Sequence, residues 1–252
     1  MNREMILCVP GPWRDRSDFV RQVTTIDANG RYFYDGSMLV DVREQDQLRV
    51  QLLGRHPRMV DAFRAAGRGD ISAELEEKIA QHQSSIYLRF AANFVEERTR
   101  VLKYTELARQ LGGMAIKIES SGVGHAWERW FHLLASQNEF DWYCAVVMLL
   151  ADEGIYYSCG MHHFGLADAA IGKHLAPRNA GNLLNKFNYW RIVEPRELKS
   201  GDIFRLDDSN RRYRVDLKRD QINPTEDLFH NPQGLWFLTL LNTEDPASLT
   251  NF

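Results

Sequence analysis

The chain has 252 residues, of which 44% are hydrophobic and 26% are charged, with a formal net charge of −3. This length can bury a sizeable core in one or two domains, and the composition is that of a soluble globular protein. It has no basic excess, no membrane-length apolar run and no long apolar leader, so we expect a cytoplasmic protein with no nucleic acid and no membrane as partners.

The three cysteines, Cys8, Cys144 and Cys159, are widely spaced. An odd number at such spacing does not make a disulfide framework. Cys8 and Cys144 lie in apolar runs and are expected to behave as small buried hydrophobic residues. We expect no cofactor.

Strands and helices are mixed in the first third of the chain. The run 5–10 is apolar and reads as a strand, and Ser17 is expected to cap a helix that ends near Thr25. Further on, short apolar runs predict strands and amphipathic stretches predict helices. The expected strands are 37–42 and 48–54, and the expected helices are 56–67 and one that begins at Ser72.

The clearest unit follows, and it has a strand–helix–strand pattern. A strand over 84–92 leads to a helix over 94–113, which ends at two glycines that suit a left-handed helix end. A second strand covers 114–120. The apolar runs and the length of the connection predict that both strands belong to one sheet.

The rest of the chain is predicted to contain two helices and several strands. The helices are 125–136 and 179–194, and the strands are a pair within 140–161 with a turn at 151–154, then 202–206, 212–217 and 234–241. Because helices and strands do not alternate strictly, the fold class is α+β, with two related halves as a further possibility. We expect a core over 1–175 and a C-terminal helix and strands over 176–252 packed on it; a single domain over 1–252 stays open.

A polar stripe marks the helix predicted over 125–136. His125, Glu128 and His132 are spaced i, i+3, i+7, opposite Trp127 and Trp130, which should be buried together with Phe131. Two histidines seven residues apart are separated by about 10 Å along a helix, too far for one metal ion. The stripe therefore indicates a solvated face or a polar surface for a partner.

The segment YYSCGMHHFGLAD, residues 156–168, joins a cysteine to two adjacent histidines. Its ligands are too few for a structural zinc site, while a Cys–His catalyst stays open. We expect a strand end and turn without metal, with Tyr157 and Cys159 on one face and with His162 and His163 pointing in different directions. If the segment has a function, its imidazoles and Phe164 suit recognition of a partner.

The stretch RRYRVDLKR, residues 211–219, is a local basic stripe with one tyrosine. It could contact nucleic acid, but four acidic residues lie within it or beside it. They are Asp207, Asp208, Asp216 and Asp220. We interpret the stripe as a strand of mixed charge.

Three stretches together resemble the bacterial domain-of-unknown-function 4261 family. They are MILCVPGPWRDRSDF, GGMAIKIESSGVGHAWERW and GIYYSCGMHHFGLAD. The resemblance covers most of residues 5–175 and leaves the tail from about 176 as an addition. It implies no reaction, but it does imply a bacterial accessory protein that accompanies secreted toxins, including those of type VI systems.

We therefore expect a non-enzymatic interaction protein, most concretely an immunity protein that binds and neutralises a cognate toxin. The alternatives are an adaptor that loads an effector on a secretion system, and a His/Cys-dependent enzyme or small-ligand binder. No catalytic or metal-binding residue is predicted. The candidate contact residues are His125, Glu128, His132, His162, His163 and Phe164.

Overall fold

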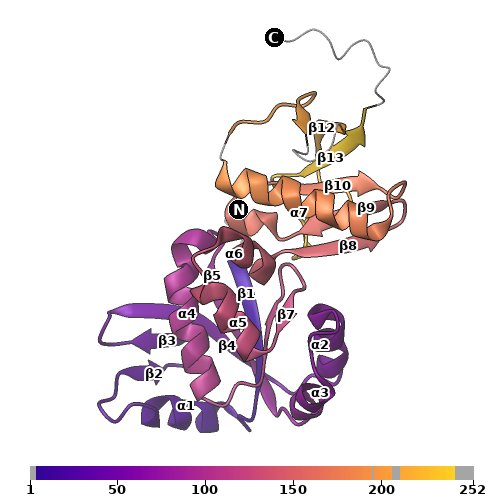
Figure 1. Cartoon of the computed structure of the whole chain (residues 1–252). Helices are drawn as coiled ribbons and strands as arrows, with labels where there is room; N and C mark the ends of the chain where they lie inside the picture. The colour runs from indigo at the N-terminus through magenta and orange to yellow at the C-terminus, as the bar shows by residue number, and fades with distance from the viewer. Residues whose placement is uncertain (1–3, 195, 206–210, 242–252) are drawn as a thin grey trace. The chain divides into compact units, whose positions relative to one another are not determined.

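The computed structural model describes residues 4–194, 196–205 and 211–241, and the chain divides into two compact units (Figure 1). The first unit is Met1–Val146 and the second is Val147–Phe252. Each unit has its own sheet and its own helices, and the α+β class is confirmed. The domain border expected after residue 175 would fall inside the second unit, between β10 (Asp168–Gly172) and α7 (Pro177–Val193).

The first unit contains a seven-stranded sheet with the order β2-β3-β4-β5-β1-β6-β7, in which neighbouring strands are antiparallel. Its strands are β1 Glu4–Gly11, β2 Tyr32–Tyr34, β3 Met38–Asp41, β4 Asp46–Gly54, β5 Ser84–Ala91, β6 Ile116–Ile118 and β7 Gly124–His125. The two strands of the predicted strand–helix–strand unit, β5 and β6, do belong to one sheet, as predicted. They flank β1, and since each is antiparallel to it, they run parallel to one another.

Helices cover both faces of this sheet. They are α1 Arg16–Thr25, α2 Met59–Gly67, α3 Ala73–Ala80, α4 Phe94–Gln110, α5 Trp127–Ala135 and α6 Glu139–Val146. Residues of α2 and α3 pack with Cys8 and Tyr87. On α4, Tyr104 packs on Phe90, with 6.4 Å between the ring centroids. Because successive residues of a strand face opposite sides, α4 covers the face opposite to α2 and α3.

Two expectations about helices in the first unit are wrong and one is confirmed. Helix α1 is capped by Asp15, whose carboxylate accepts the Asp18 N–H at 2.8 Å, so Ser17 lies inside the helix. Ser72 caps α3 as predicted. The stretch from residue 140 begins as helix α6, where a strand was expected. A run that is apolar on all sides has no hydrophobic period by which a helix could be distinguished from a strand. Asn138 caps the helix α6 by accepting the Phe140 N–H at 2.9 Å.

The second unit contains a six-stranded sheet with the order β11-β12-β13-β10-β9-β8. Its strands other than β10 are β8 Met148–Asp152, β9 Ile155–Cys159, β11 Ile203–Arg205, β12 Arg212–Lys218 and β13 Leu235–Leu240. The strand-rich end is confirmed, while β10 was not expected. All neighbours are antiparallel except β10 and β13, which are parallel. The two sheets thus differ in strand order and in pairing.

Helix α7 packs on one face of this sheet through residues such as Leu184 and Phe187, which meet Val215 and Trp236. The connection 219–234 packs on the other face through Ile222 and Phe229. Among the described residues, no helix combines the length and the apolar character that crossing a bilayer requires.

Candidate functional site

His125 does not belong to the helix on which the polar stripe was predicted. It ends β7, and α5 begins two residues later at Trp127. Its side chain is 4% exposed, and its Nε2–H donates to the Ala145 carbonyl at 2.9 Å. Burial lowers the pKa of His125 to about 4, so the imidazole is neutral. The expectation that His125 is exposed is therefore wrong.

The other two members of the stripe are exposed on α5, as expected for Glu128 and His132. On the opposite side, Trp130 is fully buried and donates its indole N–H to Thr105 Oγ1 at 3.0 Å. Trp127 is buried as well, while Phe131 is only half-buried. The structure leaves a pair of exposed polar residues in place of a stripe of three.

The segment that joins β9 to β10 is a strand end followed by a turn, as predicted, but its two histidines differ from what was predicted. Tyr157 and Cys159 pack into the same cluster, so they share a face. His162 and His163 lie in a short 3-10 helix, Met161–Phe164, with 4.1 Å between their ring centroids. The expected turn is present, and its 3-10 geometry brings the two rings next to one another, so they do not point in different directions. Both histidines are buried and Phe164 is half-buried, so neither imidazole forms an exposed surface.

A buried polar network surrounds Asp168. Its Oδ1 accepts the Ser158 hydroxyl and the Met161 N–H, both at 3.1 Å. Its Oδ2 accepts the Asn231 side-chain N–H at 2.6 Å. Burial raises the pKa of Asp168 to about 7, although these three donors act against the shift.

The same network anchors the connection 219–234. Asp220, whose side chain is fully buried, accepts backbone N–H groups of Ile222, Asn223 and Asn231. Asn231 in turn donates to Asp168. These contacts lie inside the unit and hold the connection on the sheet, so we assign the network to structure. Among the residues that the structure describes, no group of three or more His, Cys, Asp or Glu side chains could hold a metal ion.

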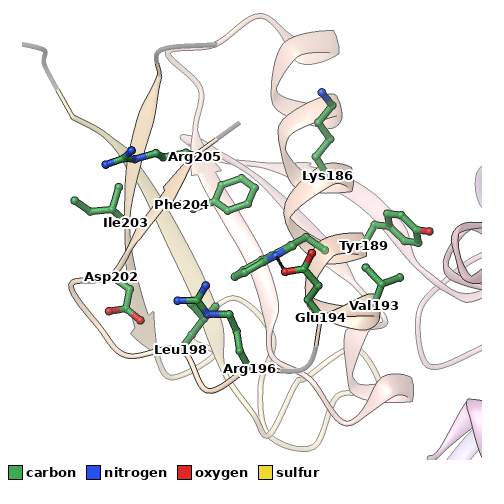
Figure 2. A pocket seen from close by; sticks show the side chains of 11 residues that line it. Lys186, Tyr189, Val193, Glu194, Arg196, Leu198, Asp202, Ile203, Phe204 and Arg205 are labelled. Atoms are coloured by element: carbon green, nitrogen blue, oxygen red, sulfur yellow. Dashed lines mark hydrogen bonds between the residues drawn. The ribbon is translucent and has the colours of Figure 1, made fainter. Parts of the chain in front are cut away.

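An open groove of about 630 Å³ lies between the C-terminal half of α7 and the edge strand β11 (Figure 2). We call it the α7–β11 groove. Eleven residues line it: Lys186, Tyr189, Trp190, Val193, Glu194, Arg196, Leu198, Asp202, Ile203, Phe204 and Arg205. Figure 2 shows Phe204 turned toward the helix, while Ile203 and Arg205 turn to the other side of the strand.

Trp190 forms the aromatic centre of this groove. Its ring centroid lies 5.4 Å from that of Phe204, and its indole N–H donates to Glu194 Oε2 at 2.8 Å. The Arg196 guanidinium lies over the same ring, 5.7 Å from its centroid. An aromatic floor with polar groups of both signs at its rim suits a protein or peptide surface, since Trp, Tyr and Arg dominate binding energy at such sites.

A second groove of about 490 Å³ lies in the first unit between α4 and β4. Several of its charged groups are paired with one another. Lys103 contacts Asp46 at 2.6 Å and Glu44 at 3.0 Å, and Arg31 contacts Glu44 at 2.8 Å. These ion pairs fasten the end of the β3–β4 hairpin to α4, so we assign this groove to structure.

In comparisons with known proteins, no family model, no curated protein and no solved structure matches this chain. The resemblance to the domain-of-unknown-function 4261 family thus stays a prediction.

The sequence itself contains a signal for the α7–β11 groove. Tyr189, Trp190 and Arg191 are consecutive, a concentration of the residue types that anchor interfaces. The helix separates them: Arg191 turns inward and donates to the Ala167 carbonyl at 2.6 Å, while Tyr189 and Trp190 line the groove. Only the position of β11, which closes the other side, makes them parts of a groove.

Proposed function

We propose that this protein is a non-enzymatic binding protein that recognises a protein partner through the α7–β11 groove. The observation that carries the proposal is an aromatic centre at Trp190, set on a helix and a sheet edge and bordered by Arg196 and Lys186. Side chains on such elements lose little freedom when a partner binds, which favours tight association.

The more specific proposal is an immunity protein that neutralises a toxin of the same bacterium. Its support is the sequence resemblance described above together with a groove that suits a protein. In this role the groove would cover a surface that the toxin needs, and the affinity would reside in the aromatic centre, with the charged rim setting orientation and partner choice.

The test is neutralisation of toxic products of genes that neighbour its own. Each product that arrests growth is co-expressed with the wild-type chain, and we expect growth to recover for one of them, with a stoichiometric complex on gel filtration. Binding without recovery of growth would favour an effector-loading adaptor. Failure of every neighbouring product to bind would contradict the proposal, and a hydrolytic activity of the purified chain would favour the enzyme.

Matched variants assign the effect to the groove. Val193 lines the groove and is 41% exposed, while Val42 in the first unit is 53% exposed and lies outside it. We expect Val193→Asp to weaken partner binding at least tenfold, because a new carboxylate beside Glu194 must be desolvated on binding. Val42→Asp should leave it unchanged. If the two substitutions weaken partner binding equally, binding does not depend on the groove.

A further inference from the structure

We propose that the partner binds as an extended strand along β11, with acidic side chains directed at the arginines on the sheet face away from α7. This inference rests on the proposed function, because it names the form and the charge of the segment that the α7–β11 groove receives. It derives from the strand register, from the distribution of charge over the two faces and from the position of the groove.

The backbone of β11 presents open hydrogen-bonding groups. Among the described residues β11 pairs with β12 alone and ends the sheet. The Val215 N–H donates to the Asp202 carbonyl at 2.9 Å, and because bonded pairs alternate in an antiparallel ladder, the next such pair is Phe204 with Tyr213. The N–H and C=O groups of Ile203 and Arg205 therefore point away from β12, to the open edge.

Like charges meet across the two strands on the face away from α7. Arg205 lies directly opposite Arg212, and Ile203 lies opposite Arg214. Arg205 and Arg212 form a pair without ladder hydrogen bonds, the type in which side chains come closest, and like charges in direct opposition are destabilising. A carboxylate placed between them would remove this repulsion.

The acidic residues in and around the basic stretch 211–219 neutralise its positive charge less than their number suggests. Asp216 shares the face and pairs with Arg214 at 2.9 Å. Asp220 is buried in the connection 219–234, where it accepts backbone N–H groups. Asp207 and Asp208 lie outside the described residues. On the described part of the face, three arginines thus stand against one aspartate.

A strand added at this edge would place its side chains alternately on the two faces. Those beside Phe204 would enter the α7–β11 groove and meet Trp190, which favours apolar or aromatic residues. Those beside Ile203 and Arg205 would lie over the arginine face, which favours Asp and Glu. The predicted segment is therefore an extended peptide in which apolar and acidic residues alternate.

The experiment selects peptides from a displayed library of random 12-residue sequences on the full-length chain. We expect enriched peptides to alternate apolar and acidic residues, and synthetic copies to bind more weakly at high salt. No enrichment, or enrichment without acidic residues, would overturn the proposal and assign the arginines to guarding the edge against pairing. A 12-nucleotide single-stranded DNA that binds this face more tightly than any selected peptide would also overturn it.

Substitutions in β11 test the strand geometry. Ile203→Pro removes an outward N–H without breaking a bond to β12, so the fold should persist while peptide affinity falls about tenfold. Ile203→Thr retains that N–H and should keep affinity within about threefold. The double variant Arg205→Glu with Arg212→Glu should abolish binding of the acidic peptides. Amide-exchange protection of β12, measured in each variant, reports whether the sheet remains folded.

The outcomes separate the two proposals. If Val193→Asp abolishes binding of the natural partner while Ile203→Pro and the double arginine variant leave it unchanged, the groove is the binding site and strand addition is wrong. If none of these variants affects the partner, both proposals fail.

Discussion

Two buried aspartates, one in each unit, have pKa shifts of opposite sign. In the first unit the Asp41 carboxylate is fully covered, and Arg31 donates to both of its oxygens, at 2.9 and 2.6 Å. This pairing lowers the pKa of Asp41 to about 2. In the second unit Asp168 accepts hydrogen bonds from Ser158, Met161 and Asn231, all of them neutral, and burial raises its pKa to about 7.

The difference shows that burial alone does not set the charge of a carboxylate. A contacting guanidinium that keeps 23% of its side chain exposed compensates the lost hydration of Asp41. Neutral donors compensate only part of it at Asp168. The first unit therefore holds its covered carboxylate charged, and the second unit holds one that takes up a proton near neutral pH.

The largest expected effect is a cavity in the core of the first unit. Trp130→Ala should lower the free energy of unfolding by about 3–5 kcal/mol, because Trp130 is fully buried. Amide exchange should show the loss in β5, while β10 of the second unit keeps its protection. Trp130→Phe, which retains most of the volume, should cost clearly less. Equal loss of protection in β10 would show that the two units unfold together.

The second prediction concerns acid. His125 has an unfolded pKa of 6.5 and a folded pKa of about 4, so its contribution to stability is present above pH 6.5 and is lost as the pH falls toward 4. The loss amounts to about 3 kcal/mol at 1.36 kcal/mol per pKa unit. Burial lowers the pKa of His82 as well, which adds in the same direction. Exchange protection of β5, corrected for intrinsic rates, should fall between pH 6.5 and 4.

The second unit should respond less to the same change, because two groups oppose one another. The folded pKa of Asp168 is raised, so its contribution is full below pH 3.8 and is lost as the pH rises through 7. The pKa of His163 is lowered by burial, which works in the opposite direction. Asp168→Asn should remove the first effect and make β10 acid-sensitive. Continued insensitivity of this variant would contradict the assignment to Asp168.

The third prediction removes a donor from the Asp168 network. Asn231→Ala should destabilise the second unit by about 2–3 kcal/mol, since Oδ2 of the buried Asp168 and the Leu166 carbonyl both lose the donor that Asn231 supplies. The control is Asn223→Ala, which loses one longer bond, of 3.3 Å, to Asp220. Thermal unfolding should show the larger decrease for Asn231→Ala, and equal decreases would mean that the donor to Asp168 has no special weight.

The smallest effect separates a covered ion pair from an exposed one. Arg31→Met should cost about 1.5 kcal/mol, because Asp41 loses a guanidinium that donates to both of its oxygens and keeps the Glu44 N–H at 3.2 Å and Lys103 at 3.5 Å. Arg64→Met should cost less than about 0.5 kcal/mol, since Arg64 is 57% exposed and surface pairs contribute little. Urea unfolding of the two variants measures the difference, and a larger cost for Arg64→Met would contradict this comparison.

Local sequence patterns are sufficient to predict the α+β class and most of the regular elements. These depend on local patterns: apolar runs predicted β1 and β5, a serine at residue 72 predicted the start of α3, and the connection between β5 and β6 predicted a shared sheet. Such signals lie within about twenty residues of one another, so they can be read without knowing what packs on them.

The positions of the polar residues, in contrast, depend on contacts between segments that are far apart in the sequence. His125 can be buried because its Nε2–H donates a hydrogen bond to the Ala145 carbonyl, twenty residues further along the chain. Burial raises the pKa of Asp168, and Asn231, which the connection 219–234 brings back over the sheet, opposes that shift as a donor. The α7–β11 groove likewise requires Trp190 and Phe204, on separate elements, to meet. Contacts between distant segments leave no period in the sequence, so burial, charge state and site geometry emerged only from the fold.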